Sequence, residues 1–256
     1  MASSLSNKQL NFARLAIACL DVIKLPLIDI LHLNVKADEL SDKIKNNQTL
    51  KKGRFRLNSK EKAKCCIQPP DIPDYSQFDV TLLCKLISHL CPSIQPRQGW
   101  GVEPSDDDEG LGDDIVRIRV LRNEVFAHAA SAEIDDEKFE KICDDIERVL
   151  TRIQTSIPDC KSVDYVVKLQ TVKGLPKDSE ECATIKPRLR EELQRIAEDI
   201  TIEVKGKLRR MKRDLTTAVR GKVKPTGKLK RMKRDLTTAV RDGSRKIRDK
   251  RDYLDN

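Results

Sequence analysis

The sequence lacks long apolar runs and contains few aromatic residues. Of its 256 residues only 4% are aromatic, and 10 are glycine. A core with so few aromatic side chains must be largely aliphatic, and the abundance of Leu, Ile, Lys, Glu and Asp favours helices over strands. The most apolar stretch, residues 15–33, is interrupted by charged residues and a proline, so it predicts neither a signal peptide nor a membrane span. We expect a soluble, intracellular, cytoplasmic all-α protein, with nuclear import left open.

The eight cysteines show no Cys-x-x-Cys rhythm of the kind that zinc sites use. Cys84, His89 and Cys91 could be combined with the Cys65-Cys66 pair into a metal site, but their spacing fits no known zinc finger. Several cysteines instead have the spacing of buried helix positions, where the thiol acts as a small apolar group. The sequence therefore predicts reduced core thiols, no metal site and no cofactor.

Positive charge is concentrated at the C-terminal end of the chain. Residues 205–256 contain 20 Lys and Arg against 6 Asp, a net charge of +14, whereas the 204 residues before them contain 30 basic against 35 acidic residues, a net charge of −5. The overall charge of +9 therefore belongs to a basic tail attached to a mildly acidic body.

The basic tail contains a tandem repeat. The segment KLRRMKRDLTTAVR at 207–220 recurs as KLKRMKRDLTTAVR at 228–241, an offset of 21 residues. The repeats lack aromatic residues for base stacking, so we expect phosphate contacts with RNA and no reading of its sequence. An anionic membrane surface, a partner helix, a nuclear-import signal and a merely solvated helix remain open. The predicted nucleic-acid-binding residues are Lys207, Arg209, Arg210, Lys212, Arg213, Lys228, Lys230, Arg231, Lys233 and Arg234.

Apolar periodicity divides the chain into three segments. It predicts an antiparallel helical bundle over residues 5–155, a linker over 156–184 and a long basic amphipathic helical extension over 185–256. Within the bundle, residues 92–112 form a connection long enough to suggest either a functional loop or a solvated loop anchored by Trp100.

Capping residues mark the expected helix ends of the bundle. A first helix should begin near Ser4 or Ser6 and be kinked or ended by Pro26. Later helices are expected over 79–91, after Asp113 or Asp114, and from Asp135 onward. The last of these has a regular apolar stripe formed by Phe139, Ile142, Ile146, Val149 and Ile153.

One arginine lies where the helical pattern predicts a buried face. At about 100° per residue, Arg122 falls in the middle of the apolar arc of its helix. Burying an unpaired guanidinium costs several kcal/mol or more, on the order of a whole side chain's hydrophobic gain. This position therefore requires either a pairing partner inside the protein or a contact outside it. The apolar arc is formed by Ile115, Ile118, Leu121, Val125, Phe126 and Ala129.

Five segments of the chain resemble, in this order, a HEPN domain: NFARLAIACLDV, FDVTLLCKLISHLCPSI, GWG, LGDDIVRIRVLRNEVFAHAA and EKFEKICDDIERVLTRI. The resemblance covers residues 5–155. It is nearest to the subgroup found in the RNA-binding, DAZ-interacting zinc-finger ubiquitin ligase and in many invertebrate immune-type proteins. Its most specific part is the Arg-polar-x-x-x-x-His signature, here Arg122, Asn123 and His128. The histidine follows Phe-Ala, whereas in the family it often follows Tyr-Gly.

The resemblance implies a homodimer in which two signature helices face each other and cleave RNA without a metal ion. His128 would move a proton for attack by the ribose 2′-OH, Arg122 would stabilise charge on the phosphate, and Asn123 would position the backbone. Arg122 and His128 are about 120° apart around one helix and roughly 9 Å apart along its axis. A facing pair of helices therefore makes a better site than one helix alone.

Two other interpretations stay open beside the ribonuclease. Arg122 could pair with an internal carboxylate such as Asp114, Asp144 or Asp145 and simply join two helices. His128 could simply favour the negative end of the helix dipole. The domain would then be a non-catalytic homotypic oligomerisation or adaptor module of the innate-immune type, because a fold alone does not establish activity.

Overall fold

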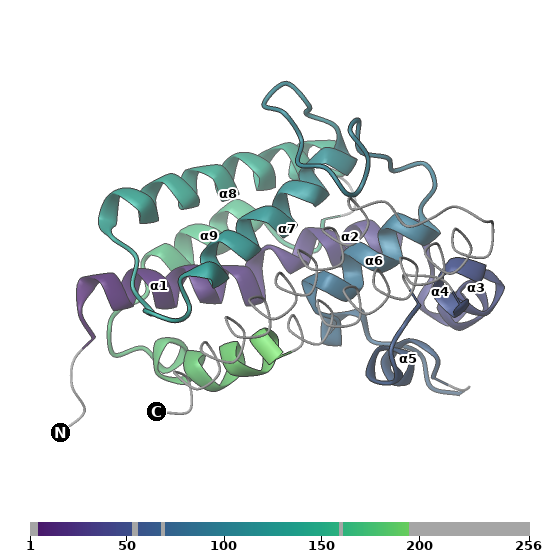
Figure 1. The fold of residues 1–256 in the computed structure, drawn as a ribbon, viewed down its shortest axis with the longest axis horizontal. Coiled ribbons are helices and arrows are strands. Elements are labelled where there is room, and N and C mark those ends of the chain that lie inside the picture. Colours follow the sequence, from purple (N-terminus) through teal and green to yellow (C-terminus); the bar gives the residue numbers. More distant parts are fainter. Residues whose placement is uncertain (1–4, 53–55, 68–69, 159–160, 195–256) are drawn as a thin grey trace, which may run out of the picture. The chain divides into compact units, whose positions relative to one another are not determined.

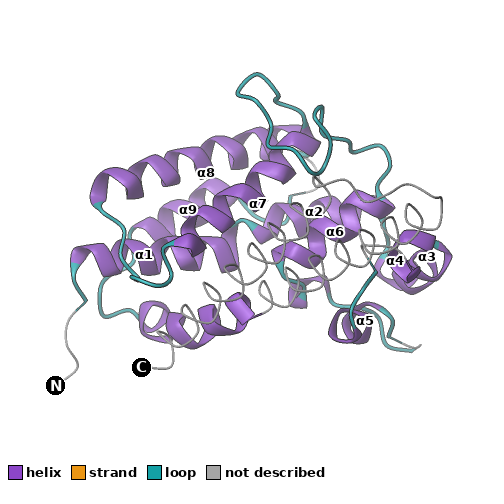
Figure 2. Cartoon of the chain, in the orientation of Figure 1, coloured by secondary structure: helices purple, strands orange, loops and turns teal. Residues whose placement is uncertain are grey.

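A computed structural model describes residues 5–52, 56–67, 70–158 and 161–194, which form helices and loops and no strand (Figures 1 and 2). The chain divides into two compact units, residues 1–185 and 186–256. The first unit contains the predicted bundle. Its α-helices are α1 Asn7–Ile17, α2 Lys24–Asn34, α3 Leu40–Asn46, α4 Gln48–Lys52, α5 Ser59–Cys65, α6 Val80–Leu90, α7 Leu111–Ala127, α8 Asp136–Ser156 and α9 Tyr165–Lys173.

The prediction of an all-α fold is confirmed for the described residues. Residues 180–194 are helical as well. None of the helices in the described ranges is both long and apolar enough to cross a membrane. The repeats at 207–220 and 228–241 lie outside the described residues, as do the ten cations predicted to contact nucleic acid.

The first helix begins at the predicted cap but does not end at the predicted proline. Ser6 and Gln9 form a reciprocal capping box at the start of α1. A short π-helical turn, Ala18–Val22, then connects α1 to α2. Pro26 lies in the first turn of α2, where the N–H groups have no intrahelical acceptor, so the proline costs no hydrogen bond.

The core forms where the apolar faces of the helices meet. α8 packs against α7, α1 and α9, and α6 packs against α2 and α7 (Figure 1). The predicted stripe of α8 is buried along its whole length, from Phe139 to Ile153, and Asp135 caps this helix as expected. The long helices α7 and α8 therefore form the frame that positions the signature residues.

The predicted linker over 156–184 contains a helix that packs on the bundle. Tyr165 and Leu169 of α9 are fully buried, and the Tyr165 hydroxyl donates to Asp29 Oδ2 on α2 at 2.5 Å. The same carboxylate oxygen accepts from the backbone N–H and the hydroxyl of Ser162. With two turns and mixed polarity, α9 has too short an apolar pattern to be read from periodicity. The buried carboxylate that accepts from Tyr165, Asp29, is 136 residues away in sequence.

Candidate functional site

Helix α7 carries all three signature residues, and it buries the arginine. Arg122 is 4% exposed. Its Nη1 donates to the hydroxyl of Thr81 at 2.7 Å, and its Nη2 donates to Oδ1 of Asn123 at 3.1 Å. The guanidinium therefore links α7 to the first turn of α6, so the arginine on the apolar stripe has partners within its own chain.

Thr81 occupies its position because of how α6 begins. Asp79 caps α6 and accepts from the backbone N–H of Leu82 at 2.9 Å, at the place where the sequence predicted this helix to begin. Thr81 follows in the first turn, half-buried, with its hydroxyl toward α7. Nothing in the local sequence marks this threonine, because its partner is 41 residues away.

The other two signature residues are more accessible than Arg122. Asn123 is exposed, and His128 is half-buried at the C-terminal end of α7. The backbone around His128 is fixed by a tight turn, because its carbonyl accepts from the N–H of Ala132 at 2.9 Å and from the hydroxyl of Ser131 at 3.1 Å. In the described part of the chain, no side chain hydrogen-bonds to the His128 ring. The structure thus joins Arg122 to Asn123, and in the described residues no hydrogen bond joins either of them to the His128 ring.

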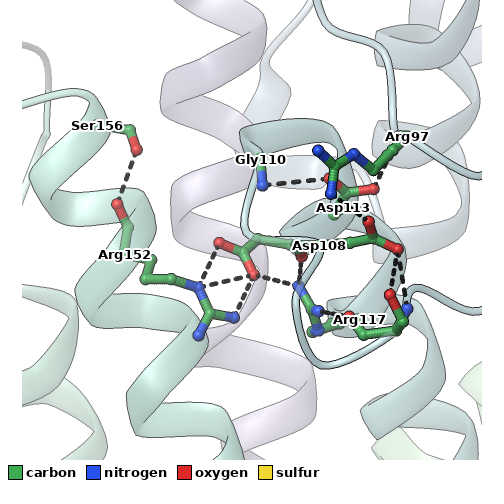
Figure 3. A network of polar contacts seen from close by, with 9 residues as sticks. Arg97, Asp108, Gly110, Asp113, Arg117, Arg152 and Ser156 are labelled. Carbon is green, nitrogen blue, oxygen red and sulfur yellow. Dashed lines mark hydrogen bonds and ion pairs between the residues drawn. The ribbon is translucent and has the colours of Figure 1, made fainter.

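Asp114, one of the three carboxylates considered above as partners of Arg122, has other partners. Asp114 is 1% exposed and accepts three hydrogen bonds from Arg152 of α8: Nε donates to Oδ1 at 3.2 Å and to Oδ2 at 3.0 Å, and Nη2 donates to Oδ1 at 2.5 Å. Arg117 adds a fourth, at 3.0 Å. The hydrogen bonds from Arg152 to Asp114, together with the charge of Asp114, raise the pKa of Arg152. A buried carboxylate does join two helices, as considered above, but its partner is Arg152, so it joins α7 to α8 (Figure 3). The surface residue Asp145 pairs with Arg148 on its own helix.

The connection over 92–112 is ordered by two more aspartates (Figure 3). Asp113 lies inside α7, which starts at Leu111, and accepts from the N–H groups of Arg97 at 2.7 Å and Gly110 at 3.1 Å. It was expected as a cap residue and instead lies at the third helical position, where its carboxylate accepts from the backbone N–H of the N-cap residue Gly110. Asp108 is 2% exposed and accepts from the N–H and the hydroxyl of Ser105.

The start of α7 also requires a glycine. A Cβ built on Gly112 would lie 2.5 Å from the carbonyl carbon of Gln95 and from the nitrogen of Pro96. Such a contact with backbone atoms cannot be relieved by a side-chain rotation. The loop thus folds against the N-terminus of α7, whereas the sequence analysis used only its length and Trp100.

The cysteines are placed as core residues. Seven of them lie in the described ranges as reduced thiols, and all of these except Cys66 are buried. Burial raises the pKa of Cys65 and of Cys143 to about 12, so both stay protonated at neutral pH. In the described part of the chain, no three His, Cys, Asp or Glu side chains are arranged to hold a metal ion.

Comparison with known proteins gives a consistent assignment. The sequence profile of the DZIP3/hRUL138-like HEPN family matches residues 36–171, more than half of the chain. The mouse E3 ubiquitin-protein ligase DZIP3 is 29% identical over 99 residues, which is 38% of this chain and 8% of the ligase. The human ligase is 29% identical over 89 residues, 34% of this chain and 7% of the ligase.

The chain therefore spans less than a tenth of the length of these relatives. The matched range ends inside α9, in agreement with the packing of that helix on the bundle. No solved structure matches the chain. The helical architecture, the signature on α7 and the profile match together place this chain in the DZIP3/hRUL138-like HEPN family.

Proposed function

We propose that this HEPN domain acts as a non-catalytic interaction module, in which Arg122 joins helices and does not contact a substrate. The observation that carries this proposal is the burial of Arg122 together with its hydrogen bonds to Thr81 and Asn123. An arginine that stabilises a phosphate must reach it directly. Here the guanidinium would first have to leave α6 and expose a buried face of α7.

A second copy of the same chain is the partner we propose. Val120, Asn123 and Ala127 are accessible and lie on one helical face of α7, flanked by the partly exposed charges of Arg119 and Glu124. Two such faces related by a two-fold axis would make a self-complementary contact. The hydrogen bond from Arg122 orients Asn123 within this face.

Replacing Ala127 with arginine tests the contact. Two added cations would meet across the two-fold axis, and an arginine at a helix C-terminus is compatible with folding. We expect wild type to be a dimer in sedimentation experiments at tens of micromolar, on the order of ordinary homodimer affinities, and Ala127→Arg to be a monomer. The matched control is Thr155→Arg, at an exposed position in the last turns of α8. A monomeric wild type would exclude the homotypic contact.

Metal-independent RNA cleavage is the second candidate, and His128 is the observation that favours it. Its ring is partly accessible, and no described side chain holds it by a hydrogen bond. Histidine can transfer protons near neutral pH, and a dimer through α7 would bring two such rings toward one another. Because Arg122 is buried, this activity requires a rearrangement of the α6–α7 contact.

Incubation of the full chain with mixed RNA separates the two candidates. A non-catalytic module leaves RNA intact, with wild type and His128→Ala indistinguishable. A ribonuclease produces 2′,3′-cyclic phosphate ends in the presence of EDTA, loses this activity in His128→Ala, and loses most of it in Arg122→Lys, which keeps the charge but not the planar fork. Cleavage by wild type that is absent from His128→Ala would overturn the first proposal.

A further inference from the structure

A second basic segment lies within the folded body, and neither function proposed above uses it. Helices α4 and α5 lie together with α3 at one end of the bundle (Figure 1). Between residues 47 and 65 the sequence has seven Lys and Arg and a single acidic residue. Lys51, Lys52, Arg56 and Lys62 are all exposed. Charge of one sign is therefore presented by a structured part of the body that lies outside the basic tail in the sequence.

The base of this segment is fixed by packing and by a backbone hydrogen bond. The N–H of Leu57 donates to the carbonyl of Leu50 at 3.0 Å, and both leucine side chains are buried. Lys51 and Arg56 directly adjoin the two bonded residues. The exposed cations therefore project from anchored backbone, so less conformational entropy is lost when they bind a ligand.

The one carboxylate of the segment is directed away from solvent. Glu61 is 8% exposed; its Oε1 accepts from Lys85 Nζ at 2.5 Å, and its Oε2 accepts from the N–H of Asn58 at 2.6 Å. By contrast, Lys43 and Lys45 on the neighbouring α3 form exposed pairs with Glu39 and Asp42. The positive charge of α4 and α5 is therefore not cancelled at the surface by Glu61.

We propose that Lys51, Lys52, Arg56 and Lys62 form a binding surface for the phosphate backbone of a nucleic-acid strand. Phosphate contacts by Lys and Arg supply sequence-independent affinity. A membrane surface fits less well, since interfacial binding uses exposed apolar side chains. The described large apolar residues that are exposed, Leu33, Ile72, Val102 and Val167, lie outside α4 and α5. This surface is independent of whether α7 cleaves RNA.

The experiment compares two four-residue variants of the full chain. The test variant changes Lys51, Lys52, Arg56 and Lys62 to Gln. The control variant removes four exposed cations elsewhere on the same unit, namely Lys141, Lys161, Lys168 and Lys177. Binding to an oligouridylate of about 12 nucleotides is followed by fluorescence anisotropy over a range of salt concentrations. All eight side chains are exposed, so we expect both variants to unfold at the wild-type temperature.

We expect the test variant to weaken RNA binding on the order of tenfold and to flatten the salt dependence by about 0.7 per lost phosphate contact. The control should change the affinity by less than about twofold. A third variant, with the ten predicted tail cations changed to Gln, reports on the tail separately. Equal losses in test and control variants would overturn the proposal. So would a tail variant that no longer binds RNA, or a test variant that loses binding only to anionic phosphatidylserine vesicles.

Discussion

The two halves of α7 bury charges of opposite sign and compensate them in different ways. Near the N-terminus, Asp114 is held by two arginines, and the helix dipole also favours a carboxylate there. In the C-terminal half, Arg122 donates hydrogen bonds to the side-chain oxygens of Thr81 and Asn123. The first half thus forms a charged link to α8, and the second a polar link to α6.

The charged link should give the larger effect on stability. Asp114→Ala would leave Arg152 and Arg117 without their shared carboxylate in a partly buried environment. Loss of one partner from such a pair costs about 3–5 kcal/mol. We expect this decrease in the free energy of unfolding, measured by urea titration. The control, Asp145→Ala, breaks the more exposed pair with Arg148 and should cost less than about 1 kcal/mol. Equal effects of the two substitutions would refute a structural role for Asp114.

The polar link should give a smaller effect. Thr81→Val keeps the side-chain shape and removes the oxygen that accepts from Arg122 Nη1. A buried donor that loses its acceptor costs about 1–3 kcal/mol. The control, Thr155→Val, removes a hydroxyl at the exposed side of α8 that donates to Thr151 O, and should cost less than about 0.5 kcal/mol. A Thr81→Val protein as stable as wild type would indicate that Arg122 does not depend on α6.

The sequence predicted those features that depend on local pattern. The apolar stripe of α8 and its cap at Asp135 follow from periodicity and from capping chemistry, and both are confirmed. The partners of buried charges could not be predicted in the same way. Thr81 lies 41 residues from Arg122, and Arg152 lies 38 residues from Asp114, so only the packing of the helices brings each pair together.

Acid should weaken the loop that folds against the N-terminus of α7. Hydrogen bonds from Ser105, and then from Gln98 and Arg97, lower the pKa of Asp108 from 3.8 to about 2. Because the folded pKa lies below the unfolded one, the stability contributed by this carboxylate is complete above about pH 4 and lost as the pH falls toward about 2.

We therefore expect the urea midpoint of Asp108→Asn to fall less than that of wild type when the pH is lowered from about 5 to about 2.5. Its exposed neighbour Asp107 provides the control, since Asp107→Asn should keep the wild-type acid sensitivity. If both variants keep the acid sensitivity of wild type, the hydrogen bonds around Asp108 do not hold the loop against α7.

The smallest expected signal comes from a thiol on α6 that reports on the surroundings of Arg122. Burial raises the pKa of Cys84 to about 11, although the charges of Arg122 and Arg119 act to lower it. At about pH 8 the thiol should stay protonated and unreactive toward iodoacetamide, while the half-buried Cys66 is more accessible to the reagent. Mass spectrometry of peptides from the labelled protein should find Cys84 unmodified, and modified once urea unfolds the chain.

Labelling of Cys84 with and without RNA distinguishes the two candidate functions. A site in which Arg122 leaves Thr81 to meet a phosphate must open the α6–α7 contact and expose Cys84. Labelling of Cys84 that appears only with RNA would favour the ribonuclease, whereas protection with and without RNA is the outcome we expect of an interaction module.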